Sequence, residues 1–425
     1  MVFGGILDMN GAIALFVSNQ IIEGHQMKKK IILSALCTLA LVGCQSEETK
    51  VTNISNEKAE DIVNTKRELA KQLGENYSSV ESTLRQNINA QQLNVPISTL
   101  VEQKPQAQMS RRFVQADEQI RTWKGVSEYT DELLEVRLAN EAMLAVWQKG
   151  DVSPLFAFEP SGDDELWQYI EAFDVNGQIH QLDVYNMPDV PVIVVDNNST
   201  KELKAGLQAM QAEMKRLGQP TQIQPYVVEK ERDQAPRMAP QYNLSAETTA
   251  PIQTTQLKKI RLSDDQEPWI SGKAEIYAIV TGVNPSRDEP ALDLVEMPYL
   301  DYDNKDYYPN QIVIHWSRYR WGAADMVLME QDDGTDYKQL AKLLVQVAEE
   351  VLKAIPDPEV QAYAIIPQIT NKIIDAIPDG VLTNDDDFVD VYYTLMQDTS
   401  YVDHPGAGVN AVVTLEPLTI NPTRP

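Results

Sequence analysis

Three acidic segments in the last third of the chain contain the residue types that could bind a metal ion. They span residues 301–306, 330–336 and 384–387, and Asp390 follows the last of them. Ca²⁺ takes roughly six to eight oxygen ligands, which flexible loops with several carboxylates can supply. We therefore predict Ca²⁺ as a candidate cofactor, with ligands drawn from these residues: Asp301, Asp303, Asp332, Asp333 and Asp336.

The same acidic residues also have a structural explanation. Asp and Asn cap helices and form turns, and Thr335-Asp336 stands where a helical pattern begins. An EF-hand is not supported, because Lys305 occupies a position that needs an oxygen ligand and no glycine follows it. Two or three acidic loops that meet at one end of a β-sandwich would instead resemble the calcium site of a C2-type domain.

The histidines offer one candidate for catalysis. The chain has four histidines and no His-Glu-x-x-His pair, Gly-x-Ser-x-Gly elbow or phosphate-binding glycine loop. His404 follows Asp403 and precedes a glycine-rich stretch, so Asp403 and His404 are the catalytic candidates. A hydrolase that uses His404 or a pair of carboxylates, as glycosidases do, is the enzymatic alternative.

The overall charge excludes some classes of partner. Lys and Arg number 36 against 63 Asp and Glu, which gives a formal net charge of −27. Phosphate backbones bind clustered cations, so nucleic acid is excluded as a partner. Both cysteines, Cys37 and Cys44, lie near the N-terminus. A chain cut before Cys44 and lipidated there would have no thiol left for catalysis, redox chemistry or thiolate zinc sites.

The N-terminal segment has the parts of an export signal. Lys28, Lys29 and Lys30 precede the apolar run 31–42. A basic region followed by a short apolar region is typical of a secretory signal, and this run is shorter than the ~20 residues that span a bilayer. The signal is therefore expected over 27–43, and residues 1–26 are expected to be a mis-assigned extension before a true start at Met27.

Leu41-Val42-Gly43-Cys44 resembles the lipobox of bacterial lipoproteins. The resemblance implies a diacylglycerol on the Cys44 sulfur and a further acyl chain, such as palmitate, on its amine. Two acyl chains give stable attachment to a membrane. Gln45 follows in place of the inner-membrane retention aspartate, so the expected location is the cell envelope, at the periplasmic or surface face of the outer membrane.

The rest of the chain predicts an α+β multidomain fold. A tether over 44–58 precedes a helical N-terminal region over 59–150, in which 127–148 has a helical pattern. A small α+β domain follows over 151–230. It contains a hairpin across the turn 174–177, a buried strand at 191–195, a helix with a Ser199–Glu202 capping box and a final strand reached by a right-handed crossover.

A linker is predicted over 231–256, because this stretch is rich in Pro, Gln and Thr and has no hydrophobic period. The remaining residues, 257–425, predict a C-terminal antiparallel β-sandwich with short strands between turns. Two amphipathic helices form a helical insertion over 336–378. Aromatic residues between 299 and 321 could line a surface that recognises glycan or peptide.

Two stretches of the chain, 167–195 and 272–390, resemble an uncharacterised family of proteobacterial envelope proteins of unknown function. The matching residues include Glu171-Ala172-Phe173-Asp174, Ala274-Glu275-Ile276-Tyr277, Met297-Pro298-Tyr299-Leu300 and Asn384-Asp385-Asp386. The resemblance implies export and this layout of domains.

These observations favour a membrane-anchored envelope lipoprotein that acts as a non-enzymatic binding module, with calcium as a candidate requirement. Its expected partners are the membrane, through the lipid anchor, and an envelope protein or glycan. The alternatives are a hydrolase exposed outside the cytoplasm and a structural role in envelope assembly.

Overall fold

The computed structural model describes most of the chain after residue 47, with side chains from residue 58 onward. The described ranges are 48–102, 107–161, 166–226, 250–264, 268–272, 274–285, 289–331, 334–355, 361–377 and 388–421. The predicted signal and extension, 1–43, lie outside them, as does most of the predicted linker. The predicted α+β class is confirmed: helices dominate the beginning of the described chain, and antiparallel sheets dominate its later part.

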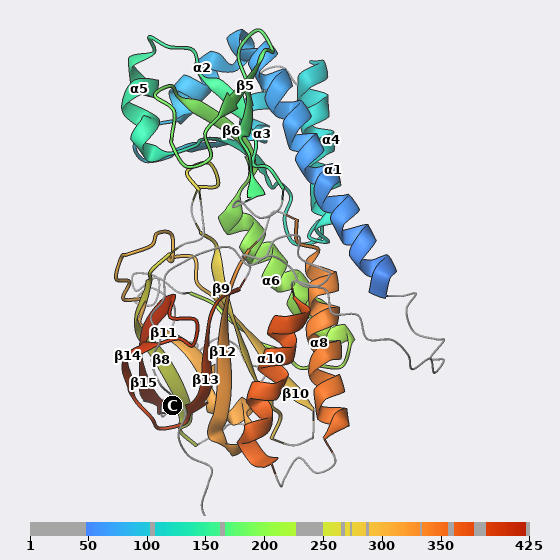
Figure 1. Ribbon diagram of the computed structural model, residues 1–425, viewed down its shortest axis with the longest axis vertical. Coiled ribbons are helices and arrows are strands. Elements are labelled where there is room, and N and C mark those ends of the chain that lie inside the picture. The colour runs from blue at the N-terminus through green and yellow to red at the C-terminus, as the bar shows by residue number, and fades with distance from the viewer. Residues whose placement is uncertain are drawn as a thin grey trace, which may run out of the picture. The chain divides into compact units, whose positions relative to one another are not determined.

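A six-stranded sheet forms the first part of the fold, with the strand order β1-β2-β6-β3-β4-β5 (Figure 1). Its strands are β1 (Asn94–Pro96), β2 (Leu134–Leu138), β3 (Leu155–Ala157), β4 (Ile170–Phe173), β5 (Ile179–Leu182) and β6 (Val192–Asn197). The accompanying helices are α1 (Glu48–Glu75), α2 (Tyr77–Asn87), α3 (Ile97–Val101), α4 (Gln108–Trp123) and α5 (Leu144–Lys149). The long helices α1 and α4 run beside each other next to this sheet.

The core of this part explains why these segments fold together. Every residue of β6 is buried, as expected for an apolar run covered on both faces. Leu69 and Leu73 of α1 and Phe113 and Ile120 of α4 are buried in the same hydrophobic cluster as the strands. Their spacing of four and seven residues puts each pair on one helix face, so the opposite faces of α1 and α4 keep polar side chains.

The predicted helix over 127–148 is wrong at its centre, where residues 134–138 form β2, and is confirmed only at its end, where residues 144–148 belong to α5. Leu134, Val136 and Leu138 are buried and recur at every second position, which is the pattern of a strand. The leucines around them also fit a helical pattern, so the sequence alone does not distinguish the two. β2 pairs antiparallel with β6, so residues 59–150 and 151–230 share one sheet and one core. The structure thus differs from the predicted division into a helical region and a separate α+β domain.

The hairpin across residues 174–177 is confirmed, with Ile170 opposite Leu182 and Phe173 opposite Ile179. The expected crossover inside the same sheet is wrong. β6 leads into α6 (Ser199–Arg216), which then leads to β7 (Ile223–Gln224), and β7 pairs with a strand of a different sheet. The predicted Ser199 cap is also wrong: the Asn198 side chain accepts a hydrogen bond from the backbone of Lys201 instead.

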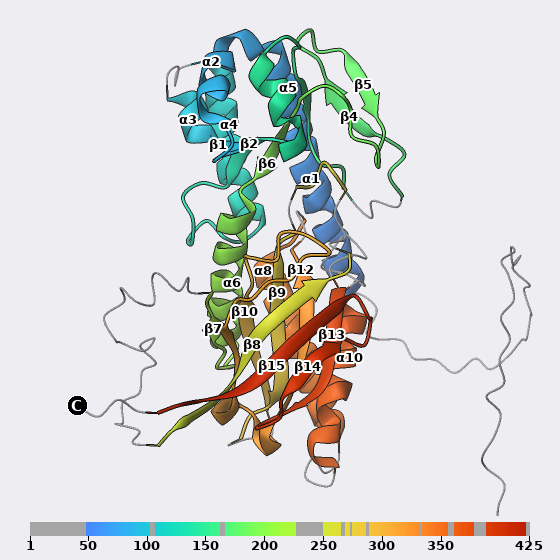
Figure 2. The same ribbon diagram turned by 90° about the vertical axis from the view of Figure 1, so that its left-hand side faces the viewer.

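Two further sheets pack face to face and confirm the predicted sandwich (Figure 2). The five-stranded sheet has the order β13-β12-β9-β10-β7, and the four-stranded sheet has the order β11-β8-β15-β14. The strands are β8 (Ile252–Leu262), β9 (Ile276–Val283), β10 (Pro290–Glu296), β11 (Gln311–His315), β12 (Ala323–Glu330), β13 (Phe388–Met396), β14 (Tyr401–Pro405) and β15 (Ala411–Ile420). Pairing is antiparallel except between β10 and β7.

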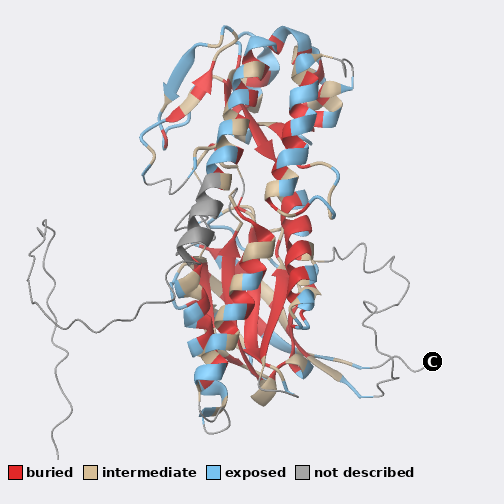
Figure 3. Ribbon diagram, turned by 90° about the vertical axis from the view of Figure 1, so that its right-hand side faces the viewer, coloured by how far each residue is buried: buried red, intermediate tan, exposed pale blue. Residues whose placement is uncertain are grey.

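A layer of helices covers the other face of the five-stranded sheet (Figure 3). It contains α6 together with α8 (Tyr337–Ala354) and α10 (Ile366–Ala376), which are the predicted helical insertion. The helix α6 meets α8 closely at Gly206, where an added Cβ atom would lie 2.3 Å from the Tyr337 ring. A glycine is therefore needed where these two helices cross. With this helix layer, the C-terminal part of the fold has three layers: the helices, the five-stranded sheet and the four-stranded sheet.

Candidate binding site

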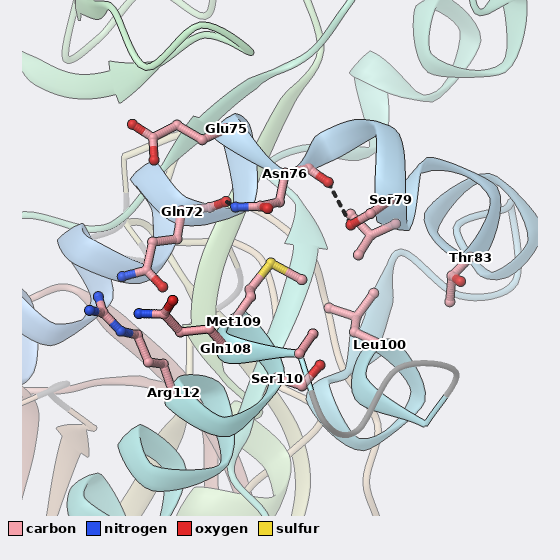
Figure 4. Close-up of a pocket in the computed structure, with 12 residues that line it drawn as sticks. Gln72, Glu75, Asn76, Ser79, Thr83, Leu100, Gln108, Met109, Ser110 and Arg112 are labelled. Atoms are coloured by element: carbon pink, nitrogen blue, oxygen red, sulfur yellow. Dashed lines mark hydrogen bonds between the residues drawn. The ribbon is translucent and has the colours of Figure 1, made fainter.

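A pocket of 340 Å³ lies where α1 ends and α2 begins, and α3 and the start of α4 close it (Figure 4). Its volume is at the lower end of the range that holds small ligands, roughly 300–1,000 Å³. The lining mixes polar and apolar side chains: Gln72, Glu75, Asn76, Ser79, Val80, Thr83, Leu100, Ala107, Gln108, Met109, Ser110 and Arg112.

Helix periodicity explains why polar side chains gather there. Gln72 and Asn76 are four residues apart and therefore lie on one side of the helix, next to its buried leucines, and Asn76 lies between α1 and α2. On α4, Gln108 and Arg112 are also four residues apart, and both are exposed, whereas Phe113 is buried. In Figure 4, Gln72, Gln108 and Arg112 project toward one another at one end of the pocket.

The start of α4 leaves several hydrogen-bonding groups unused. The residue before the helix is Ala107, which has no side chain that can cap it, and the first turn contains no acidic residue. The backbone N–H groups of Gln108 and Met109 donate to no described group, as expected for an uncapped first turn. Arg112 is exposed and forms no ion pair with a described carboxylate. The pocket therefore presents several donors at one end.

The other end of the pocket is less polar. Leu100 and Thr83 are buried, with 5% of each residue exposed, and Met109 lies between them and Arg112 in Figure 4. Among the described residues, none pairs with the Thr83 hydroxyl, although the Thr83 carbonyl accepts a hydrogen bond from Asn87. The pocket thus combines a cationic end, an apolar middle and the hydroxyl of Thr83.

A second group of ionisable side chains lies buried beside the first sheet. The carboxylate of Asp196 accepts hydrogen bonds from Lys66 Nζ and Arg137 Nε, both at 2.8 Å. Burial alone would raise the pKa of Asp196, but these two cations hold it below its usual range. Arg137 also donates to the carbonyls of Ile270 and Ser271. Lys66 is fully buried and Asp196 is 7% exposed, so this network joins segments and leaves little access for a ligand.

Glu135 and Glu275 belong to the same region. Burial raises the pKa of Glu135 to about 7, against the lowering effect of hydrogen bonds from Asn198 and Asn94. Burial also raises the pKa of Glu275 well above its usual value, although part of that residue remains exposed. Perturbed carboxyl groups are found at active sites and in structural ion-pair networks alike. The 4% exposure of Glu135 favours the structural role.

The predicted calcium ligands do not form one described cluster. Asp301 and Asp303 lie in the segment between β10 and β11, where Asp303 Oδ2 accepts a hydrogen bond from Asn304 at 2.6 Å. Asp336 caps α8 and forms an ion pair with Lys58 at 2.8 Å. The remaining predicted ligands, Asp332 and Asp333, lie outside the described residues. Within the described ranges, no group of three or more His, Cys, Asp or Glu side chains could hold a metal ion.

The third acidic segment, 384–387, also lies outside the described residues, but Asp390 is described and completely buried. Its carboxylate accepts hydrogen bonds from the backbone N–H groups of Val391, Gly408 and Ala411, each at 2.7 Å. Asp390 therefore organises the loop before β15. Gly406 belongs to this arrangement, because a Cβ atom there would lie 2.2 Å from the Asp390 carboxyl carbon.

The catalytic candidates, Asp403 and His404, lie on β14, a strand that the sequence pattern did not reveal. Asp403 pairs with Lys259 at 3.0 Å. The His404 ring lies 5.1 Å from the Tyr401 ring and 6.0 Å from the Tyr392 ring, measured between centroids. Asp403 and His404 thus lie on the same strand. Among the described residues, however, Asp403 pairs with Lys259, and the His404 ring lies near the rings of Tyr401 and Tyr392.

Sequence reasoning did not identify the pocket residues. One available signal was the pair Arg111-Arg112 at the start of a helix. Cations at a helix N-terminus are unfavourable, and this chain is rich in acids that would suit the position.

The comparison with protein families gives one result. The family described as "Protein of unknown function (DUF3103)" matches residues 66–423, which include the last ten residues of α1, the helices α2, α3 and α4, and both later sheets. No match was found among curated proteins or among solved structures. Because the family match covers most of the chain, the protein belongs to the DUF3103 family of proteins of unknown function.

Proposed function

We propose that the protein is a lipid-anchored protein of the cell envelope that binds a small ligand in the pocket between α1, α2, α3 and α4. The observation that carries this proposal is the pocket itself, with backbone donors at the start of α4 and an exposed Arg112 that have no partner among the described residues. Such groups lose hydrogen bonds to water when a ligand covers them, so they favour a ligand that replaces those bonds.

The lining supports binding more than catalysis. Its described residues include one carboxylate, Glu75, and one guanidinium, Arg112, and neither histidine nor cysteine. Glu75 lies 4.0 Å from Lys71, and in Figure 4 its carboxylate points away from Arg112. General acid–base catalysis needs two groups within reach of the same reacting atoms. The described lining offers hydrogen bonds and apolar contact instead.

The anchor part of the proposal rests on Leu41-Val42-Gly43-Cys44. Among the helices of the described chain, none is both long enough and apolar enough to cross a bilayer. Attachment by lipid predicts that labelled palmitate is incorporated into the wild-type chain and not into Cys44→Ala, and that this variant leaves the membrane fraction. Equal labelling or equal membrane retention of the two chains would contradict the anchor.

A pocket-filling substitution tests the binding part of the proposal. Ser79 lines the pocket and is exposed, and its neighbour Ser78 is exposed without lining the pocket. Ser79→Trp should fill the pocket, whereas Ser78→Trp adds the same side chain outside it. We expect at least one member of a panel of amino acids, short peptides and oligosaccharides to raise the melting temperature of wild type and Ser78→Trp, but not of Ser79→Trp. An equal rise in both variants, or no rise with any compound, would refute binding at this site.

A further inference from the structure

We infer that the free edge of β5 is a docking site for an extended, positively charged segment of a partner protein, which adds to the six-stranded sheet as a further strand. β5 (Ile179–Leu182) is the last strand of this sheet, and β4 is its neighbour among the described strands. Figure 2 shows β5 at the rim of the first part of the fold. β5 contributes no residue to the pocket lining, so this site is separate from the pocket.

The backbone of β5 offers hydrogen bonds along this edge. β4 and β5 pair without a register shift, and the Asp174 N–H donates to the Gln178 carbonyl at 3.0 Å. In antiparallel pairs, residues that bond the neighbouring strand alternate with residues whose backbone groups face away from it. The N–H and C=O groups of Ile179 and Gln181 therefore point out of the sheet, and they bond no described group. An added strand can pair with both residues.

β5 lacks the features that protect other sheet edges. Edge strands usually carry proline, charged side chains or bulges that prevent pairing with another chain. β1, at the opposite edge of the same sheet, contains Pro96. β14, at the edge of the four-stranded sheet, contains Asp403 and Pro405 and pairs with a register shift. Apart from its short length, β5 has no such protection: its sequence is Ile-His-Gln-Leu, its register is regular, and three of its four residues are exposed.

The segments next to β5 carry exposed apolar side chains. The described chain has eleven large hydrophobic side chains that are exposed, and five of them lie between residues 166 and 187: Leu166, Tyr169, Ile179, Tyr185 and Met187. Ile179, on the strand itself, is 55% exposed. Concentrated exposed apolar side chains indicate an interaction surface. A strand that docks on β5 would gain apolar contact as well as backbone hydrogen bonds.

Charge indicates that the docking segment is cationic. Residues 166–190 contain no Lys or Arg and four acidic residues: Glu171, Asp174, Asp183 and Asp189. Arg67 pairs with Glu171 at 2.6 Å, and His180 lies 3.5 Å from Asp174. Asp174 lies in the turn before β5 and Asp183 follows its last residue, so both ends of the strand are acidic. Hydrogen bonds from backbone N–H groups lower the pKa of both aspartates. A segment with Lys or Arg near both ends would complement them.

A second copy of this chain does not provide that complement. Two β5 strands that pair antiparallel bring Asp174 of one copy near Asp183 of the other, and like charges across a strand pair are destabilising. Each chain also carries a formal net charge of −27, which keeps copies apart. The edge therefore favours a different, cationic chain over self-association.

The test uses three acetylated heptapeptide amides: Lys-Thr-Val-Thr-Val-Thr-Lys, Glu-Thr-Val-Thr-Val-Thr-Glu, and the lysine peptide with its three central amides methylated. Their affinities for the full chain in detergent are measured by fluorescence anisotropy. We expect the lysine peptide to bind about tenfold more tightly than the glutamate peptide, because its ends form ion pairs where glutamate meets like charge. The methylated peptide should not bind, since it cannot pair with a strand. Bound lysine peptide should slow deuterium exchange at the N–H groups of Ile179 and Gln181.

Gln181 offers a matched pair of variants. Gln181→Pro removes an N–H that points out of the sheet, which edge strands tolerate, whereas Gln181→Thr keeps it. Gln181→Pro should weaken the lysine peptide about fivefold through the lost hydrogen bond, and Gln181→Thr should bind like wild type. Ile179→Lys keeps every backbone group and should also weaken this peptide about fivefold, through charge repulsion and lost apolar contact. If Gln181→Pro unfolds at a lower urea concentration than wild type, Ile179→Lys decides the question.

Failure of the lysine peptide to bind wild type would overturn the inference, as would equal affinity for the lysine and glutamate peptides. Equal binding by wild type and Ile179→Lys would also overturn it, and so would protection from exchange confined to segments other than β5. A wild-type dimer in analytical ultracentrifugation that Ile179→Lys dissociates would show that a second copy occupies this edge, and would contradict a cationic partner.

Discussion

Replacement of Glu135 by glutamine should stabilise the protein in a pH-dependent way. Glu135 is 4% exposed, and burial raises its pKa from 4.5 to about 7. Between these two pH values the Glu135 carboxyl is therefore protonated in the folded protein, whereas the same carboxyl has lost its proton in the unfolded chain. Because the folded-state pKa lies above the unfolded value, stability falls as pH rises through this window, and the full cost is present above pH 7.

The magnitude follows from the size of the shift. Each pKa unit corresponds to about 1.4 kcal/mol, so ionisation of Glu135 costs about 1 kcal/mol at pH 5.5 and about 3 kcal/mol at pH 8.5. Glutamine has no such cost, and its side-chain oxygen can still accept hydrogen bonds from Asn94 and Asn198, which both bond the same Glu135 oxygen now. The stability gained by Glu135→Gln should thus grow by about 2 kcal/mol between the two pH values.

Urea unfolding followed by circular dichroism at pH 5.5 and pH 8.5 measures this difference. Exposed Glu118 on α4 provides the control, because Glu118→Gln removes one negative charge from the surface. The same stability difference at both pH values, or a variant that is less stable at pH 8.5, would refute the reasoning that burial controls this carboxyl.

Three other substitutions or conditions test separate parts of the structure. Gly206→Ala should lower the free energy of unfolding by about 1–3 kcal/mol, because the added methyl group overlaps the Tyr337 ring; an unchanged urea midpoint would contradict that crossing. Asp390→Ala should lower it by about 3–5 kcal/mol, since three backbone N–H groups lose their acceptor, and full stability would contradict the role of this residue. The calcium proposal predicts that millimolar Ca²⁺ raises the melting temperature of wild type and not of Asp303→Ala, whereas no rise in wild type would end it.

Periodicity predicted the later part of the fold well because most of its elements carry a clear pattern. The strands that became β9, β12 and β15 are apolar runs between turn residues, and α8 has leucine and valine side chains on one face. β14 was missed because Tyr401–Pro405 contains Asp, His and Pro and is largely exposed. A strand at the edge of a sheet needs little apolar sequence, so its pattern is weak.

The arrangement of the first part was harder to predict, because it depends on pairing between distant segments. β2 is a strand because β6 is its partner, with Val136 opposite Val195, and local sequence does not reveal a partner about sixty residues away. The pocket has the same origin. Gln72, Thr83 and Arg112 come from three helices, and their spacing along the chain carries no motif. Only the start of α4, which has no capping residue, could have indicated the pocket from the local sequence.

The acidic residues show how function and structure compete in the same pattern. Asp336 was predicted as a metal ligand because it stands in an acidic segment, and Asp390 follows another such segment. In the structure Asp336 caps a helix, and Asp390 binds three backbone N–H groups. Both roles use the same property, a carboxylate that accepts several hydrogen bonds, so residue type alone does not separate them.

Hydrogen–deuterium exchange of the full chain, with and without its best-binding compound, tests the central claim most directly. Binding in the pocket predicts slower exchange at the end of α1 and the beginning of α2, residues 72–83, and at the start of α4, residues 107–112, where the N–H groups of Gln108 and Met109 have no described acceptor. Ser79→Trp should remove this protection and Ser78→Trp should preserve it. Protection confined to other segments, such as the acidic loop 301–306 or β14, would contradict the account.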